Sequence, residues 1–177
     1  MSSHSKAETI AKDIKLLILD VDGVLTDGGI YFDDNGTEHK KFDSQDGCGI
    51  KLLELSGVEV AIITARSTRS VAHRLETLGV KNYYHGIKDK GEALKELSEK
   101  LSIDLSESAF VGDDVIDLPA MSKVALPIAV ANAHSFVKEN ALMVTEKAGG
   151  SGAVREVCDF LLKAQNKYDS LMKSFVK

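Results

Sequence analysis

Short apolar runs that end at an acidic or hydroxyl residue recur along this sequence and alternate with stretches of helical period. The runs occupy residues 14–20, 58–64 and 108–113, with weaker ones at 82–84, 128–130 and 141–144. Between them, apolar residues recur at helical spacing, as in Leu75 and Leu78 before Gly79, a residue typical of helix ends. Strands that alternate with helices indicate β-α-β units, which build a mainly parallel sheet with helices on both faces. The sequence therefore predicts a Rossmann-like, doubly wound α/β fold.

One segment, residues 28–42, departs from that alternation. It holds an Asn35-Gly36 pair between two arms of β-prone residues, which is a strong signal for a β-hairpin. Because the segment follows the first strand, we expect the hairpin to project from the carboxyl edge of the sheet. Ligands bind at that edge in open α/β sheets.

The chain has 177 residues, enough for one ordinary domain. No linker-like stretch divides it, so we expect a single domain over residues 14–164. Residues 1–13 are then expected to form a polar N-terminal tail, and residues 165–177 a C-terminal helical tail.

Charge and hydropathy argue against several classes of partner. Acidic residues outnumber basic residues by 27 to 22, so we expect neither a nucleic-acid binder nor a binder of anionic membranes. The N-terminus lacks the apolar core of a signal peptide, and no stretch approaches the length of a membrane span. These observations predict a cytoplasmic protein. Cys48 and Cys158 have no metal-ligand spacing and are interpreted as reduced packing residues.

Carboxylates gather directly after two of the expected strands. They are Asp20, Asp22 and Asp27 after the first run, and Asp113, Asp114 and Asp117 after the run at 108–113. Neighbouring parallel strands would bring several of these groups together, where like charges repel unless a cation or a proton lies among them. An all-oxygen ligand set suits Mg²⁺, which also favours a substrate phosphate as a ligand. The sequence therefore predicts a magnesium site at this edge of the sheet.

The pair Asp20 and Asp22, two residues apart, suits covalent phosphoryl transfer. One carboxylate can attack phosphorus, while the second protonates the leaving alcohol and later activates water. Hydroxyl and cationic groups must hold the phosphoryl oxygens, and Thr64 and Lys90 can supply them. Lys88 is an alternative cation, although the spacing before residues 91–93 favours Lys90.

Four motifs, in order, resemble those of the haloacid dehalogenase superfamily of phosphotransferases. They are "LLILDVDGVLTDGG", "IITARS", a helix-opening Lys90 and "FVGDDVIDLPA". The resemblance implies that Asp20 is the nucleophile and a Mg²⁺ ligand. It implies that Asp22 is the general acid/base, with its backbone carbonyl on the metal. Thr64 and Lys90 are the implied phosphate-binding residues, and Asp113 is the implied third protein ligand of Mg²⁺.

Longer segments resemble the 3-deoxy-D-manno-octulosonate 8-phosphate (KDO 8-phosphate) phosphatases over residues 14–162. They are "DVDGVLTDGGIYFDDNGTEHKKFDSQDGCGIKLL", "TARSTRSVAHRLETLG" and "GGSGAVREV". The resemblance implies hydrolysis of this sugar-acid phosphate in lipopolysaccharide precursor biosynthesis. It also implies a chain without a cap domain, for which the length indeed leaves no space, and a homotetramer whose neighbouring subunits complete each active site.

The same resemblance implies a set of contacts to the sugar acid. These residues are Asp46, Gly47, Lys51, Arg66 and Arg74. Residues 149–152 can be interpreted either as a flexible connector or as a segment that folds over a substrate with the help of Arg155.

Two positions depart from or qualify the family pattern. Gln45 stands where many relatives have arginine, so one basic contact to the substrate carboxylate is missing or replaced. Arg66 favours the eight-carbon substrate over a nine-carbon ketoacid phosphate of the sialic-acid type, which is the nearest alternative.

The remaining acidic residues, Asp114 and Asp117, are expected to have supporting roles. Asp114 can cap a helix, contact the metal ligands, or do both.

Two other classes of protein remain as alternatives. A phospho-accepting signalling receiver also uses an acidic cluster, a threonine and a lysine, but its lysine comes last, whereas Lys90 precedes Asp113. A catalytically inactive interaction subunit would not need intact motifs.

Overall fold

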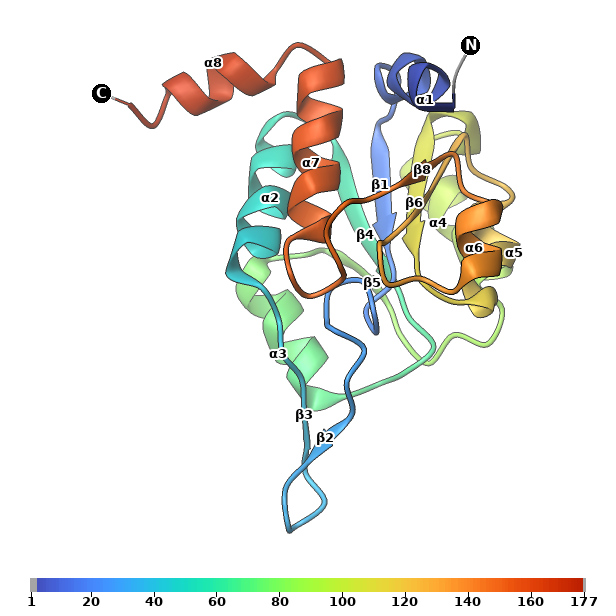
Figure 1. Ribbon diagram of the computed structural model, residues 1–177, viewed down its shortest axis with the longest axis vertical. Helices are drawn as coiled ribbons and strands as arrows, with labels where there is room; N and C mark the ends of the chain where they lie inside the picture. The colour runs from blue at the N-terminus through green and yellow to red at the C-terminus, as the bar shows by residue number, and fades with distance from the viewer. Residues whose placement is uncertain (1–2, 177) are drawn as a thin grey trace.

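A parallel sheet of six strands forms the centre of the computed structural model, which describes residues 3–176 (Figure 1). Its order is β5-β4-β1-β6-β7-β8, and all neighbouring pairs are parallel. The strands are β1 (Leu16–Leu19), β4 (Glu59–Ile63), β5 (Asn82–Tyr84), β6 (Ser108–Gly112), β7 (Leu126–Ala129) and β8 (Met143–Val144). The six apolar runs of the sequence thus supply the six strands, and the expected doubly wound α/β fold is confirmed.

The position of β1 at the centre of the sheet explains why its sequence is uniformly apolar. All four of its residues are buried, because it has a strand on each side and helices on both faces. Leu19, its last residue, pairs with Ile62 of β4 and with Val111 of β6. Asp20 therefore leaves the sheet beside the ends of both neighbouring strands.

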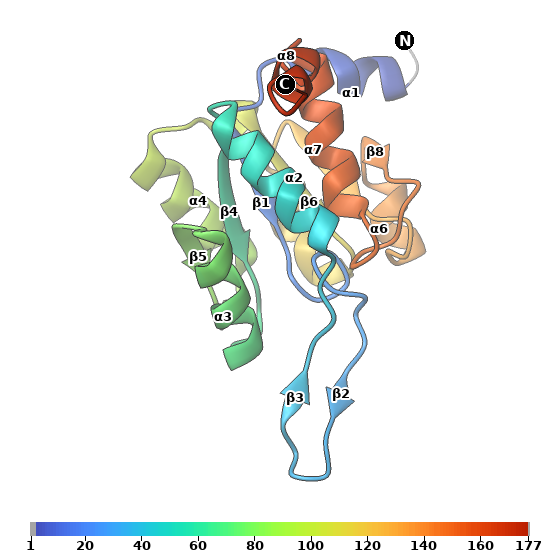
Figure 2. The same cartoon turned by 90° about the vertical axis from the view of Figure 1, so that its left-hand side faces the viewer.

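Helices cover the two faces of this sheet, as Figures 1 and 2 show, with α2, α3 and α7 on one side and α4 and α5 on the other. The helices are α1 (Ser3–Ala11), α2 (Ser44–Leu55), α3 (Arg69–Leu78), α4 (Lys90–Leu101), α5 (Leu118–Met121), α6 (Ser135–Glu139), α7 (Ala153–Ala164) and α8 (Tyr168–Lys173). Two short 3₁₀ turns, η1 (Leu105–Glu107) and η2 (Val115–Asp117), flank β6. Among the described residues, α2 and α7 make the most extensive contact between helices.

Local capping fixes where the helices near the site begin and end. Asp43 accepts hydrogen bonds from two backbone N–H groups at the start of α2, and Asp89 does the same at the start of α4. Gly79 takes the left-handed conformation, with φ of 65°, at the end of α3, as expected from the sequence. Asp89 thereby holds Lys90 in the first turn of its helix.

The hairpin of residues 28–42 pairs β2 (Tyr31–Phe32) with β3 (Glu38–His39) in antiparallel register. It projects from the end of the molecule opposite α1 and α8, as Figure 2 shows. An isolated bridge between Thr26 and Phe42 closes its base. The expected hairpin is therefore present, and its base is attached to the loop that follows β1.

The two ends of the chain are more ordered than the sequence suggested. The expected polar tail contains helix α1, in which Ala7 and Ala11 are fully buried and pack near α7. Spaced alanines bury little area, so this helix gives only a weak apolar signal. At the other end, α7 stops at Ala164, and α8 follows after a turn at Asn166 with φ of 57°. No helix within residues 3–176 has both the length and the apolar character that a membrane crossing requires.

Candidate active site

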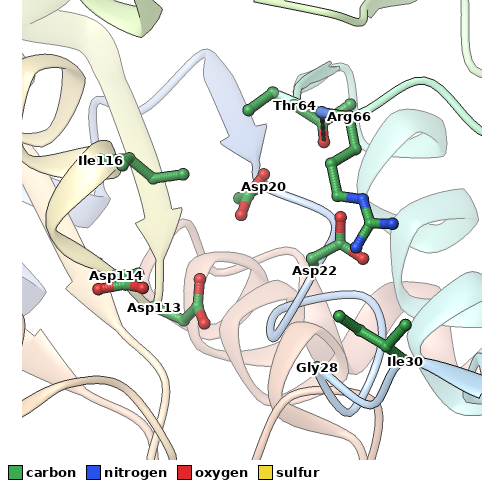
Figure 3. Close-up of a pocket in the computed structure, with 10 residues that line it drawn as sticks. Asp20, Asp22, Gly28, Ile30, Thr64, Arg66, Asp113, Asp114 and Ile116 are labelled. Atoms are coloured by element: carbon green, nitrogen blue, oxygen red, sulfur yellow. Dashed lines mark hydrogen bonds between the residues drawn. The ribbon is translucent and has the colours of Figure 1, made fainter. Parts of the chain in front are cut away.

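A pocket opens at the carboxyl edge of the sheet, above the ends of β1, β4 and β6 (Figure 3). The residues that line it are Asp20, Asp22, Gly28, Ile30, Thr64, Ala65, Arg66, Asp113, Asp114 and Ile116. In Figure 3, Asp22 and Arg66 lie together on one side of Asp20, and Asp113 lies on the other. The motif residues that follow three different strands are thus brought to one site.

Lys90 lies beneath this pocket between two carboxylates. Its ammonium group is 2.7 Å from Asp20 Oδ1 and 2.6 Å from Asp117 Oδ1, and its side chain is 2% exposed. Burial opposes the charged form of Lys90, but the two carboxylates outweigh this effect and raise its pKa above the ordinary value. Lys90 is therefore a fixed cation next to Asp20. The alternative, Lys88, is exposed at the surface.

Asp117 holds the loop that carries Asp113. While one of its carboxylate oxygens contacts Lys90, the other accepts hydrogen bonds from the backbone N–H groups of Asp113, at 2.9 Å, and Asp114, at 3.3 Å. Asp114 in turn caps the turn η2 by accepting from Val115 N–H. These contacts agree with the supporting roles expected for Asp114 and Asp117.

Asp113 comes unusually close to the loop after β1. A methyl group at Gly23 would lie 2.1 Å from Asp113 Oδ2, and Gly23 has φ of 87°, so both space and backbone conformation require glycine there. Burial and the neighbouring Asp20 raise the pKa of Asp113 to about 8. Burial and Asp117 likewise raise the pKa of Asp20, against the lowering effect of Lys90.

The acidic cluster fits a divalent cation. Carboxylate oxygens of Asp20, Asp113 and Asp117 all lie within 4.8 Å of one another. With Lys90 between two of them, the ionised groups carry a formal charge of two minus, which Mg²⁺ would neutralise. Because Asp117 is already committed to Lys90 and to backbone N–H groups, Asp20 and Asp113 are the carboxylates best placed to hold the ion.

Thr64 directly follows β4 and is 2% exposed. Its hydroxyl oxygen accepts a hydrogen bond from Arg66 N–H at 3.3 Å, and its backbone carbonyl accepts from Ile87 N–H. The hydroxyl proton remains available to a phosphoryl oxygen in the pocket that Thr64 lines. Thr64 thus lines the pocket, and its contact with phosphate stays a prediction.

The second arm of the hairpin contributes two residues that the sequence did not single out, Glu38 in β3 and Lys40 just after it. The ammonium group of Lys40 pairs with Asp22 Oδ1, and it lies 2.9 Å from Glu38 Oε1. Glu38 Oε2 accepts from Arg66 Nη2 at 2.8 Å. A continuous chain of charges therefore links Asp22 to Arg66. In the sequence, this chain of charges was indicated only by the mixture of acidic and basic residues in the second arm of the hairpin.

Of the five expected sugar contacts, Arg66 lines the pocket, and the other four lie along α2 and α3. Lys51 pairs with Glu54 at 2.8 Å on the surface of α2. The guanidinium group of Arg74 lies near Phe42 and donates to Asp43 carbonyl oxygen at 3.5 Å. A methyl group at Gly47 would lie 2.4 Å from Arg74 Nη2, so Gly47 gives this arginine its space.

Asp46, although also expected to bind the sugar acid, points to the start of α7. It is 1% exposed, and its Oδ1 accepts from Arg155 N–H at 2.8 Å. Burial raises the pKa of Asp46 to about 6, although the N–H donors of α7 work against that rise. Asp46 thus acts as a cap supplied by one helix to another.

Residues 149–152 pack against the loop after β1. Gly150 N–H donates to Val24 carbonyl oxygen at 3.0 Å, and a methyl group at Gly149 would lie 1.7 Å from Gly23 carbonyl oxygen. Asn132 joins the two loops, because its side chain donates to Gly23 carbonyl oxygen and accepts from Gly149 N–H. In the described chain this segment is a support for the loop of Asp20 and Asp22.

Comparisons with known proteins show the family of this chain. Residues 84–157 match the family model for haloacid dehalogenase-like hydrolases. The 3-deoxy-D-manno-octulosonate 8-phosphate phosphatase of Salmonella typhi is 53% identical over 161 residues, which cover 91% of this chain and 86% of that protein. This chain belongs to the KDO 8-phosphate phosphatase family. The resemblance that the sequence motifs indicated is thereby confirmed.

Solved structures of family members have the same architecture. The Moraxella catarrhalis KDO 8-phosphate phosphatase, in complex with magnesium ion, phosphate ion and a KDO molecule, is 43% identical with a TM-score of 0.94. The match covers 97% of this chain and 98% of that one. The cobalt-bound family member from Haemophilus influenzae is 36% identical with a TM-score of 0.90, over 95% of this chain and 99% of that one.

Proposed function

We propose that this protein is a Mg²⁺-dependent phosphatase that hydrolyses KDO 8-phosphate to KDO and phosphate in lipopolysaccharide precursor biosynthesis. The observation that carries the proposal is Asp20 at the end of the central strand, with Lys90 at 2.7 Å and Asp22 facing the same pocket. Membership of the KDO 8-phosphate phosphatase family supports the choice of substrate.

The reaction would proceed through Asp20 and Asp22 in two steps. A carboxylate oxygen of Asp20 attacks phosphorus as the bond to the sugar oxygen breaks, and Asp22 gives its proton to that leaving oxygen. Asp22, now a carboxylate, then takes a proton from a water molecule that attacks the aspartyl-phosphate. Phosphate leaves, and Asp20 is restored.

The surrounding residues would hold charge during both steps. Thr64 donates a hydrogen bond to a phosphoryl oxygen, and Lys90 supplies positive charge next to Asp20. When bound, Mg²⁺ would be held by Asp20, Asp113 and the backbone carbonyl of Asp22, and would neutralise charge on the phosphoryl oxygens. Arg66 lines the pocket with a side chain that is 41% exposed, so its guanidinium group can meet the carboxylate of a sugar acid.

The decisive experiment measures phosphate release by the wild type and by Asp20→Asn in the presence of Mg²⁺. The variant keeps the size of the side chain but loses the nucleophile, so turnover should fall to background while the thermal unfolding midpoint is retained. Turnover at the wild-type rate would contradict the role of Asp20. A receiver would turn over its own phosphoryl group slowly, whereas a phosphatase releases many equivalents of phosphate.

A panel of substrates tests the sugar. We expect kcat/KM to be higher for KDO 8-phosphate than for a nine-carbon ketoacid phosphate, because Arg66 favours the eight-carbon acid. A generic hexose phosphate should be poorer than both. Preference for the hexose phosphate would overturn the choice of substrate class.

We further propose a cytoplasmic homotetramer in which neighbouring subunits complete each active site. The hairpin supports this assembly, because Ile30 lines the pocket and is exposed, and the next two residues along the hairpin, Tyr31 and Phe32, are also exposed large side chains. In a chain without a cap domain, a neighbouring subunit would cover the site and exclude water from it. Lys51 on α2 and Arg74 on α3 would then contact the sugar acid in this assembly. Asp46 would act indirectly, because it caps the start of α7.

A further inference from the structure

The side chain of Lys40 is completely shielded from solvent, although the hairpin that carries it projects from the molecule. Its ammonium group lies between Asp22, on the edge of the pocket, and Glu38 on the same arm of the hairpin. Asp22 keeps 26% of its side chain exposed, so only the lysine end of this pair is withdrawn from water. Such a pair is a weak source of stability, because the loss of hydration of the ammonium group offsets much of the attraction. The placement of this pair therefore calls for a role other than stability.

The backbone around Lys40 is fixed to the loop of Asp22. Two residues after Lys40, Phe42 bridges to Thr26. The Thr26 hydroxyl group in turn accepts from the N–H groups of Gly23 and Gly28 at 3.3 Å each and donates to Val21 carbonyl oxygen. Lys40 and Asp22 are thus held on two segments whose separation is set by backbone contacts.

The contact to Lys40 also selects one oxygen of Asp22. Lys40 engages Oδ1, and Asp22 lines the pocket. We therefore assign proton transfer to the other oxygen, Oδ2. In the acid form of Asp22 the proton is then on Oδ2, while Oδ1 accepts the hydrogen bond from Lys40. A carboxyl group held by this charge-assisted hydrogen bond keeps its orientation, whereas one free to rotate reaches the leaving oxygen only part of the time. On the other side of Lys40, Glu38 fixes the guanidinium group of Arg66 at 2.8 Å.

We propose that Lys40 is a positioning residue that orients Asp22 toward the leaving oxygen, with Glu38 as its anchor. The inference rests on the proposed phosphatase function. It adds two residues of the second hairpin arm to those that assist departure of the sugar oxygen. It assigns a task to the hairpin within a single chain, separate from any task in subunit association.

Leaving-group dependence tests this role. Phenyl phosphate needs a proton on its departing oxygen, whereas p-nitrophenyl phosphate releases a stable anion that departs without one. The quantity to compare is kcat/KM, because it reports the steps through the first irreversible transfer to Asp20 and excludes the later hydrolysis of the aspartyl-phosphate.

For Lys40→Met, we expect kcat/KM with phenyl phosphate and with KDO 8-phosphate to fall by about 100-fold, the lower end of the usual range for general acid catalysis. With p-nitrophenyl phosphate the loss should be at least about tenfold smaller. Lys40→Arg should recover part of the activity on phenyl phosphate. The matched control is Lys41→Met, since Lys41 is exposed beside Lys40, and its kinetics should equal those of the wild type.

An equal loss on both aryl phosphates, or no loss on either, would overturn the proposal. If Lys40→Met does not fold, as judged by circular dichroism, Lys40→Gln replaces it, because its amide keeps one hydrogen-bond donor and should show a smaller loss with the same contrast. The aryl comparison does not depend on the natural substrate. A wild type that ignores KDO 8-phosphate but hydrolyses aryl phosphates would refute the proposed substrate and still decide the role of Lys40.

Discussion

The carboxylates of Asp20 and Asp113 are held close together and largely away from water. Each therefore binds a proton more readily than an ordinary aspartate when no cation is present. Burial and the charge of Asp20 raise the pKa of Asp113 to about 8. A proton and a metal ion therefore compete for the same oxygen atoms. The competition makes metal affinity a function of pH.

We expect Mg²⁺ to bind more weakly as pH falls from about 8 to about 6, by up to about tenfold per pH unit for each proton displaced. The sign follows from the raised pKa: below it, Asp113 holds a proton that the ion must remove. Isothermal titration calorimetry at several pH values measures the affinity. Asp113→Asn serves as the control and should show greatly reduced binding at every pH. An affinity independent of pH in this range would contradict the prediction.

The residues of this cluster could be predicted from the sequence because each follows a strongly apolar strand. The ends of β1, β4 and β6 must meet in a parallel sheet, and so Asp20, Thr64 and Asp113 must meet as well. Lys40 offered no such signal. Its position depends on how the hairpin folds back toward the loop after β1, which is a tertiary property of the chain.

At the scale of elements, α2 and α7 are joined by a buried carboxylate. Asp46 of α2 accepts the Arg155 N–H group in the first turn of α7, where Gly152 stands at the cap position and supplies no side chain. This cap explains why α7 can begin directly after a glycine-rich segment. It could not be predicted from the sequence, since the two helices are far apart along the chain.

Removal of this cap should destabilise the protein. For Asp46→Ala we expect the free energy of unfolding to fall by about 1–2 kcal/mol, as for other lost caps. Asp46→Asn keeps an acceptor oxygen and should lose less. Urea unfolding monitored by circular dichroism gives both values. Equal losses for the two variants would show that the hydrogen bond to Arg155 N–H is not the source of the effect.

The same carboxylate should make stability depend on pH. Burial raises the pKa of Asp46 to about 6 in the folded chain from an ordinary value of 3.8, so the folded state binds the proton more tightly. This contribution to stability is complete below about pH 4 and is lost as pH rises through about 6. Compared with the wild type, Asp46→Asn should therefore gain stability as pH rises over this range. A constant difference in unfolding free energy would contradict the raised pKa.

The glycine-rich segment before α7 makes a second contact between elements that a substitution can probe. In Gly149→Ala the new methyl group would lie 1.7 Å from Gly23 carbonyl oxygen, so the loop of Asp20 and Asp22 must move. We expect lower kcat together with a lower unfolding midpoint. The control is Gly36→Ala at the hairpin tip, where a methyl group meets nothing within 4 Å and only backbone strain of about 1–2 kcal/mol is added. Unchanged kcat in Gly149→Ala would show that the contact is not needed for activity.

At the scale of the whole molecule, the hairpin presents apolar side chains to solvent in the single chain. Phe32 is 62% exposed and Ile30 is 59% exposed. If these side chains lie between subunits, Phe32→Asp would place a charge in the interface and should shift the mass in solution from four chains toward one. Light scattering coupled to size-exclusion chromatography measures this mass. A wild type that already elutes as a monomer would contradict the proposed tetramer.

The position of β1 between β4 and β6 also has a consequence for how the chain reaches its native state. Leu19 is synthesised early, but its partners Ile62 and Val111 come much later. The central strand therefore cannot pair until both neighbouring strands are available. Contacts between distant parts of a chain form slowly, because closing long loops is entropically unfavourable. The repelling carboxylates of Asp20 and Asp113 come together only when β6 docks. A divalent ion present at that moment would favour docking, and refolding should then proceed faster in Mg²⁺ than in a chelator.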